Sequence, residues 1–194
     1  MNRDVFQVAL GEYTLRCRAD SLPDGYEQYC QHATLVDERN LQAEHEHNCF
    51  VAVGKNMEWP FLVVAVGRVP KWTDQEIRPE VLVLPTTSRM FLGVQERLLC
   101  YDLDGPMRLW EDREDPDREF WGWRRHGKVV LMAAELELTA WDSYGRKQWT
   151  TFVEPPWTYR IEADAVQLTV LGVTVSFPLE VGPMWGDTLP WVAR

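Results

Sequence analysis

The sequence lacks an excess of positive charge and any apolar run long enough to cross a membrane. Its 194 residues carry 20 Lys plus Arg against 30 Asp plus Glu, which gives a formal net charge of −10. A nucleic-acid binder needs a basic face for the phosphates, so this class of protein is not expected. The longest apolar stretch, Pro60–Gly67, has the length of a strand, whereas a spanning helix needs about 20 residues. Charges also interrupt the first residues before a signal-peptide core can form, so we expect a cytoplasmic protein without membrane contact.

The sequence also lacks the usual motifs of redox, nucleotide and hydrolytic chemistry. Its four cysteines contain no CxxC pair, and reduced thiols are the expectation for Cys17, Cys30, Cys49 and Cys100. It has no GxSxG nucleophile elbow, no GxGxxG fingerprint and no phosphate-binding GxxxxGK[ST] loop. These absences favour a protein that is not an enzyme and needs no cofactor.

One cluster keeps an enzymatic alternative open. In the segment Glu44-His45-Glu46-His47, a strand would place His45 and His47 on the same face, where both could ligate one metal ion. This pair resembles the HxH start of the metal site of cupins, and the resemblance implies a metal-dependent, cupin-like enzyme. The carboxylate that such a site has a few residues later is missing here, because Phe50–Val53 is apolar. The competing interpretation is a solvated polar end of a helix or strand.

The hydrophobic pattern predicts an all-β fold. Apolar residues alternate from Phe6 to Leu10 and from Tyr13 to Cys17, which predicts a hairpin, and short apolar runs bounded by Pro and Gly dominate after Cys49. The one helix is predicted near residues 26–45, a stretch without Gly or Pro. We expect a single β-rich domain over 1–194, with an N-terminal subregion 1–85 and a repeat-bearing subregion 86–194.

The C-terminal half contains internal repeats. Met90–Trp110, Val129–Trp149 and Ala165–Gly182 can be aligned, and each contains an apolar strand, a short turn and a second strand. The first two share an aromatic-Asp pair, a Gly and a Trp, at Tyr101-Asp102, Gly105 and Trp110 and at Trp141-Asp142, Gly145 and Trp149. A repeated pattern predicts a repeated environment, so we expect Trp110 and Trp149 to be equivalent and largely buried.

The shared motif resembles the hairpin of PQQ-type and WD-type β-propeller repeats, over residues 90–182 only. The resemblance implies that the Asp and the Gly shape the turn and that the Trp packs between blades. The chain is too short for six to eight blades of about 40 residues. We therefore expect an antiparallel meander of repeated hairpins, arranged as a partial propeller, a sandwich or an open barrel, with no cofactor carried over.

Tryptophan is abundant, with ten residues, and Trp110, Trp121 and Trp123 flank the most acidic segment of the chain. Glu111–Glu119 contains six acids and two arginines, and Trp121 and Trp123 follow it. One interpretation is a solvated loop. The other is a docking loop in which acids steer a basic partner and aromatic rings anchor it. The predicted partner-binding residues are Glu111, Asp112, Glu114, Asp115, Asp117, Glu119, Trp121 and Trp123.

Three functional hypotheses follow. The first is a non-enzymatic module that binds a basic protein, for example an inhibitor or immunity-type protein that neutralises a basic toxin or nuclease. The second is the metal-dependent enzyme that uses His45 and His47. The third is a scaffold subunit of a larger assembly. The sequence does not specify an oligomeric state.

Overall fold

The structure, a computed structural model, describes residues 5–19, 21–41, 48–67, 79–94, 97–113 and 120–184. Antiparallel strands dominate these residues, and the all-β prediction is confirmed. The chain divides into two compact units, Met1–Asp112 and Arg113–Arg194. The sequence placed an internal boundary at 85/86 instead, and the expectation of a single domain stays a prediction.

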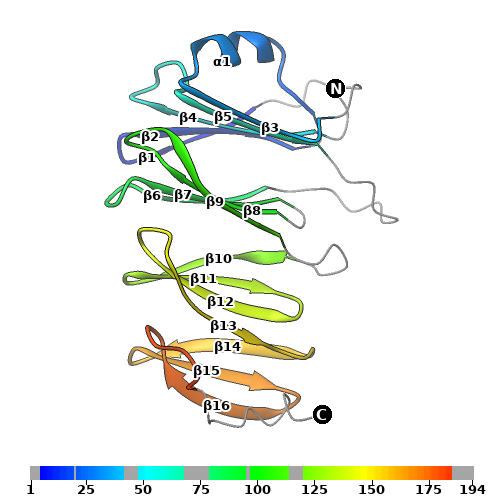
Figure 1. The fold of residues 1–194 in the computed structure, drawn as a ribbon, viewed down its shortest axis with the longest axis vertical. Helices are drawn as coiled ribbons and strands as arrows, with labels where there is room; N and C mark the ends of the chain where they lie inside the picture. The colour runs from blue at the N-terminus through cyan, green and yellow to red at the C-terminus, as the bar shows by residue number, and fades with distance from the viewer. Residues whose placement is uncertain are drawn as a thin grey trace. The chain divides into compact units, whose positions relative to one another are not determined.

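The first unit contains two sheets (Figure 1). The N-terminal sheet has the strand order β1-β2-β4-β5-β3, and a four-stranded sheet that we call the first meander has the order β6-β7-β8-β9. The strands of the N-terminal sheet are β1 (Phe6–Leu10), β2 (Tyr13–Arg18), β3 (Leu35–Arg39), β4 (Asn48–Lys55) and β5 (Leu62–Gly67). Those of the first meander are β6 (Glu80–Leu84), β7 (Arg89–Val94), β8 (Arg97–Asp102) and β9 (Met107–Arg113). The predicted N-terminal hairpin is present, since β1 pairs with β2 from Phe6↔Cys17 to Leu10↔Tyr13.

The helix is shorter than the sequence indicated. It spans only Tyr26–His32 (α1), and Leu35–Arg39 forms β3 instead. The reason is tertiary, because β3 pairs in parallel with β5 and so adds an edge strand to the N-terminal sheet. In the described part of the chain, no helix has the length and hydrophobicity to cross a membrane.

The continuous apolar runs of β4 and β5 exist because both faces of these strands are buried. On one face, Phe50, Ala52 and Val63 are covered by α1, through residues that include Tyr26 and Tyr29 (Figure 1). The other face forms the core of the first unit with the first meander. Its buried residues come from alternate positions of both sheets and include Val51, Val53, Leu62, Val64, Met90, Leu92, Leu99 and Tyr101.

The second unit also contains two sheets. The second meander has the order β10-β11-β12-β13, and the C-terminal sheet has the order β14-β15-β16 (Figure 1). The strands are β10 (Phe120–His126), β11 (Val129–Ala134), β12 (Glu137–Asp142), β13 (Lys147–Phe152), β14 (Trp157–Glu162), β15 (Ala165–Val170) and β16 (Val173–Pro178). The core of this unit contains Leu131, Leu138, Ala140, Trp149, Trp157, Val166, Leu168, Val170, Phe177 and Leu179.

The repeated Asp of the two meanders shapes the turn that follows it. In the first meander, Asp102 Oδ1 accepts a hydrogen bond from the backbone N–H of Asp104 at 2.9 Å. In the second, Asp142 Oδ1 accepts from the backbone N–H groups of Tyr144 and Arg146, both at 2.9 Å. A carboxylate that bonds the backbone two residues later is the usual way in which Asp stabilises a turn. The sequence alignment of these two hairpins therefore has a shared physical basis.

The two repeated tryptophans are less alike than the alignment predicts. Trp149 is buried, packs edge-on against Phe177, and donates a hydrogen bond from Nε1 to the carbonyl oxygen of Leu179 at 2.7 Å. Trp110 is only half-buried and packs edge-on against Phe91, with ring centroids 6.1 Å apart. In the second meander the β12–β13 register shifts between Ala140 and Trp141, and Trp149 lies opposite Ala140, which belongs to the core of the second unit.

Candidate partner-binding site

The exposed aromatic surface of the second unit begins at a β-bulge. Phe120 pairs with Ala134 and Gly122 pairs with Ala133, so Trp121 is the extra residue that has no partner in β11. A bulge leaves its additional residue outside the ladder and can redirect the side chain. Here the indole of Trp121 remains 45% exposed, which is unusual for so large an apolar group at a strand start.

Trp121 is held by other aromatic rings in spite of its exposure. Its ring stacks on Trp157 with centroids 4.9 Å apart and planes inclined by 21°. Trp157 in turn stacks on Tyr159, two residues later on the same face of β14, at 6.3 Å and 25°. We call Trp121, Trp157 and Tyr159 the aromatic stack.

The base of the aromatic stack is rigid. Trp157 is 5% exposed and donates a hydrogen bond from Nε1 to the carbonyl oxygen of Glu135 at 2.8 Å. Stacked aromatic pairs contribute about 0.5–1.5 kcal/mol beyond their buried area. The exposed indole of Trp121 therefore lies on a fixed support, and little conformational freedom remains for it to lose when another molecule contacts it.

The second predicted tryptophan has a different place. Trp123 is 4% exposed and packs against Phe120 at 5.6 Å and against Trp141 at 5.3 Å. It supports strand β10 rather than presenting a ring to solvent. Of the two tryptophans that the sequence proposed for partner contact, only Trp121 offers an exposed face.

The acidic residues of the predicted loop are only partly within the described ranges. Asp112 is half-buried near the end of β9. Glu114, Asp115, Asp117 and Glu119 lie outside the described residues. Glu111 belongs to the first unit and takes part in an ion-pair cluster there.

We call this cluster the rim network, because it joins edge strand β3 to edge strand β9. It comprises Asp37, Arg39, Arg97, Tyr101, Arg108 and Glu111. Asp37, which is only 7% exposed, accepts hydrogen bonds from Tyr101 Oη at 2.9 Å and from Arg108 Nη1 at 3.0 Å, and it pairs with Arg39 Nη2 at 2.8 Å. On β9, Glu111 pairs with Arg97 and with Arg108, the latter at 3.2 Å.

Within the rim network, Tyr101 is held in its protonated form. Burial, together with the charge of Asp37, raises the pKa of Tyr101 well above its ordinary value, so the phenol stays protonated and donates to Asp37. Both carboxylates are engaged by guanidinium groups, which leaves no carboxylate placed as a general base. The network thus holds two sheet edges together, and Glu111 serves this internal role.

The other chemical candidates are the metal site at His45 and His47 and the four cysteine thiols. His45 and His47 lie outside the described residues, and within those residues no group of three or more His, Cys, Asp or Glu side chains is arranged to hold a metal ion. All four cysteines are described and none forms a disulfide. Burial raises the pKa of the Cys17 thiol to about 12, so little of the nucleophilic thiolate exists at neutral pH.

The sequence did not predict that Trp157 and Tyr159 support the ring of Trp121. The Trp-Gly-Trp run at 121–123 carried the signal for the bulge, since a Gly inside a strand pattern often marks one. The partners Trp157 and Tyr159 are more than 30 residues away in the chain, and no local pattern connects them to Trp121. The contacts of Glu111 with Arg39 of β3 and Arg97 of β8 also join residues that no local pattern connects.

No family model matches the chain, and no curated protein matches its sequence. Among solved structures, it is similar to Kluyveromyces lactis Hsv2 with its complete loop 6CD, with 9% identity, 58% of this chain and 34% of that chain covered, and a TM-score of 0.31. It is also similar to BamB from Moraxella catarrhalis, with 8% identity, 88% and 70% coverage and a TM-score of 0.28.

A third similar structure is a protein of unknown function from Bacteroides caccae, with 12% identity, 67% of this chain and 54% of that chain covered, and a TM-score of 0.40. The chain spans about a third of the length of the Hsv2 structures. Hsv2 and BamB are β-propellers. At these TM-scores the similarity carries no argument about function.

Proposed function

We propose that this chain is a non-enzymatic protein-binding module whose contact surface centres on Trp121 and whose partner is a basic protein. The single observation that carries the proposal is the aromatic stack, in which a bulge presents an exposed indole on a buried support. Binding energy at protein interfaces is concentrated in a few large aromatic and Arg anchors. A rigid Trp is such an anchor because it offers contact area at small entropic cost.

The charge of the chain supports a basic partner. A net charge of −10 attracts a basic protein over distances up to about 8 Å at physiological salt, and more strongly at lower salt. The exposed face of an indole also attracts Arg and Lys side chains through its ring electrons. Steering by the acids and anchoring by Trp121 therefore favour the same class of partner. An inhibitor or immunity-type protein that neutralises a basic toxin or nuclease is the specific form of this proposal.

The test is the binding kinetics of a basic protein encoded next to the gene of this chain. Trp121→Ala is expected to raise the dissociation rate by about 30-fold or more, which corresponds to a contact worth about 2 kcal/mol. Phe152→Ala is the matched control, because Phe152 has the same 45% exposure, lies in the same unit and is not part of the aromatic stack. Equal dissociation rates for the two variants would contradict the proposal.

The steering part is tested separately. Asp112, Glu114 and Asp115 changed together to Lys are expected to lower the association rate several-fold at low salt and less at high salt, because rim charges act mainly on association. Glu111 is left unchanged, since its reversal would break the rim network. An association rate that depends on neither these charges nor salt would exclude a basic partner.

A further inference from the structure

The C-terminal sheet ends in an edge strand that nothing in the described part of the chain covers. This sheet has the order β14-β15-β16, so β16 has a hydrogen-bonded neighbour strand on one side only. We propose that β16 pairs antiparallel with β16 of a second copy of this chain, which joins two C-terminal sheets into one across a two-fold axis. This interface is separate from the surface around Trp121.

The register of the β15–β16 hairpin shows which backbone groups are available. The two-residue turn Leu171-Gly172, with φ of 51° and 81°, is flanked by the pair Val170↔Val173. In an antiparallel ladder, alternate residues bond to the neighbouring strand, so Val173, Val175 and Phe177 bond to β15. The N–H and C=O groups of Thr174 and Ser176 then point away from β15. In the described residues no backbone hydrogen bond reaches them from that side.

Apart from Pro178, which ends the strand, β16 lacks the features that normally protect an exposed edge. Its sequence VTVSFP has no charged residue, and its register with β15 is unbroken along its whole length. The edge strand β9 carries Arg and Glu side chains, and β10 carries two Arg and a bulge. Charges and bulges at edges prevent pairing with other strands, so their absence from β16 leaves this edge open to pairing.

The side chains of β16 are self-complementary, and this selects a second copy as the occupant. A two-fold axis at Val175 places Thr174 opposite Ser176 of the second copy and Val173 opposite Phe177 of the second copy. Polar residues then meet polar ones on the outer face, where Thr174 and Ser176 already bond Thr169 and Gln167. Apolar residues meet on the inner face and cover Val173, which is 47% exposed.

The exposed apolar side chains at the two ends of β16 fit the same arrangement. Leu171 is 45% exposed at the start of the strand, and Val181 is 60% exposed in the turn after its end. Antiparallel pairing brings the start of one β16 beside the end of the other, so each Leu171 approaches the turn with Val181 of the second copy. The closed two-fold form, in which one patch contacts itself, is the commonest symmetry of homo-oligomers.

The experiment measures self-association of the full chain by sedimentation velocity over a range of concentrations, for two charge variants. In Thr174→Lys/Ser176→Lys, lysines stand opposite lysines across the two-fold, and the association constant is expected to fall by about tenfold. In Thr174→Lys/Ser176→Glu, each Lys stands opposite a Glu of the second copy, and the constant is expected to rise by about tenfold. Both variants place their charges on the exposed outer face of the monomer.

Opposite effects of the two variants establish both the interface and its register. A wild-type chain that stays monomeric at all concentrations overturns the proposal, and so does a dimer whose association constant changes equally in both variants. A dimer unaffected by either variant places self-association elsewhere and also overturns it. Added salt provides an independent check, because it screens the repulsion between two chains of charge −10 and is expected to strengthen this dimer.

Discussion

The two units join their sheets at the rim by different chemistry. In the first unit, three guanidinium groups, two carboxylates and a phenol connect β3 to β8 and β9. In the second unit, two aromatic contacts that we call the aromatic rim have this role: the stacking of Trp121 on Trp157, and the packing of the buried Trp149 on Phe177 with its hydrogen bond to Leu179. Both solutions hold two sheets together, but they expose different groups.

The ionic and the aromatic contacts differ in the free-energy cost of burying their groups. Charges taken from water must regain their solvation energy from partners, and the rim network does so incompletely, since the buried Nε of Arg97 has no hydrogen-bond partner. Aromatic rings have no such cost, provided that each indole N–H finds an acceptor, as those of Trp149 and Trp157 do. An aromatic rim can therefore leave one ring partly exposed, and this is what makes Trp121 available for contact.

The largest expected loss of stability follows from removing a ring of the aromatic rim. Trp149→Ala removes a buried ring and its hydrogen bond and should lower the free energy of unfolding by about 3–5 kcal/mol. Trp110→Ala should lower it by about 2 kcal/mol, because that ring is only half-buried. Urea unfolding of both variants measures the difference. Equal losses would restore the equivalence that the sequence repeat predicts.

The rim network should lose almost as much stability when one of its two carboxylates is removed. Asp37→Ala removes the acceptor of Tyr101 Oη and leaves Arg39 and Arg108 with Glu111 alone, and we expect a loss of about 3 kcal/mol in the free energy of unfolding. Asp104→Ala is the control, because the side chain of Asp104 is 70% exposed. If urea unfolding showed the same small change for both, the rim network would contribute nothing to stability.

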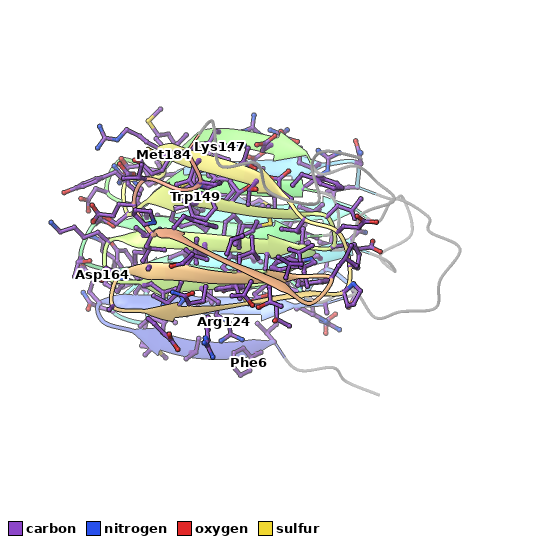
Figure 2. All side chains as sticks on the ribbon, turned by 90° about the horizontal axis from the view of Figure 1, so that it is seen from below. Phe6, Arg124, Lys147, Trp149, Asp164 and Met184 are labelled. Carbon is purple, nitrogen blue, oxygen red and sulfur yellow. The ribbon has the colours of Figure 1, made fainter. Side chains whose placement is uncertain are left out.

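The next largest loss of stability is expected at the close contact between Gly182 and Trp149. Figure 2 labels Trp149, against which Gly182 packs so closely that an added Cβ would lie 2.4 Å from Cγ of the indole. Gly182→Ala should therefore destabilise by about 2–4 kcal/mol, through steric overlap and through the positive φ of 76°. Gly172→Ala has a similar φ of 81° but open space around it, and should lose only about 1 kcal/mol. Melting temperatures that fall equally would show that only the backbone angle matters.

The smallest change in the free energy of unfolding is expected at the turn of the second meander that contains Asp142. Burial tends to raise the pKa of Asp142, but hydrogen bonds from the backbone and side chain of Arg146 and from the backbone of Tyr144 lower it below its ordinary 3.8. A lowered folded-state pKa means that the carboxylate stabilises the fold fully above pH 3.8 and loses this contribution as the pH falls through the lower folded value.

The measurement for this turn compares the wild type with Asp142→Asn. We expect the wild type to be more stable by about 1–2 kcal/mol at neutral pH, because hydrogen bonds to a charged group are stronger than those to an amide. The difference should shrink below pH 3.8. A stability difference that stays constant as the pH is lowered from about 6 to about 2 would contradict this account of the turn.

Sequence prediction succeeded for local interactions and failed for contacts between residues far apart in the chain. The aromatic-Asp motif correctly located two turns, since an Asp that bonds the backbone two residues later is a local interaction. The predicted helix near 26–45 extended too far because β3 is stabilised by pairing with β5, from which it is separated by β4 in the chain. Glu111 and Asp112 were grouped with the loop after them, although Glu111 contacts β3 and β8 instead.

The sequence by itself determined the all-β class, the N-terminal hairpin, the buried runs of β4 and β5 and the Asp turns. Each depends on alternation or on bonds between residues a few positions apart. Only the tertiary structure decided which tryptophans are exposed, which acids are ion-paired and which strands lie at the sheet edges. These properties depend on residues far apart in the chain, such as Trp121 and Trp157 or Asp37 and Arg108, and packing alone brings them together.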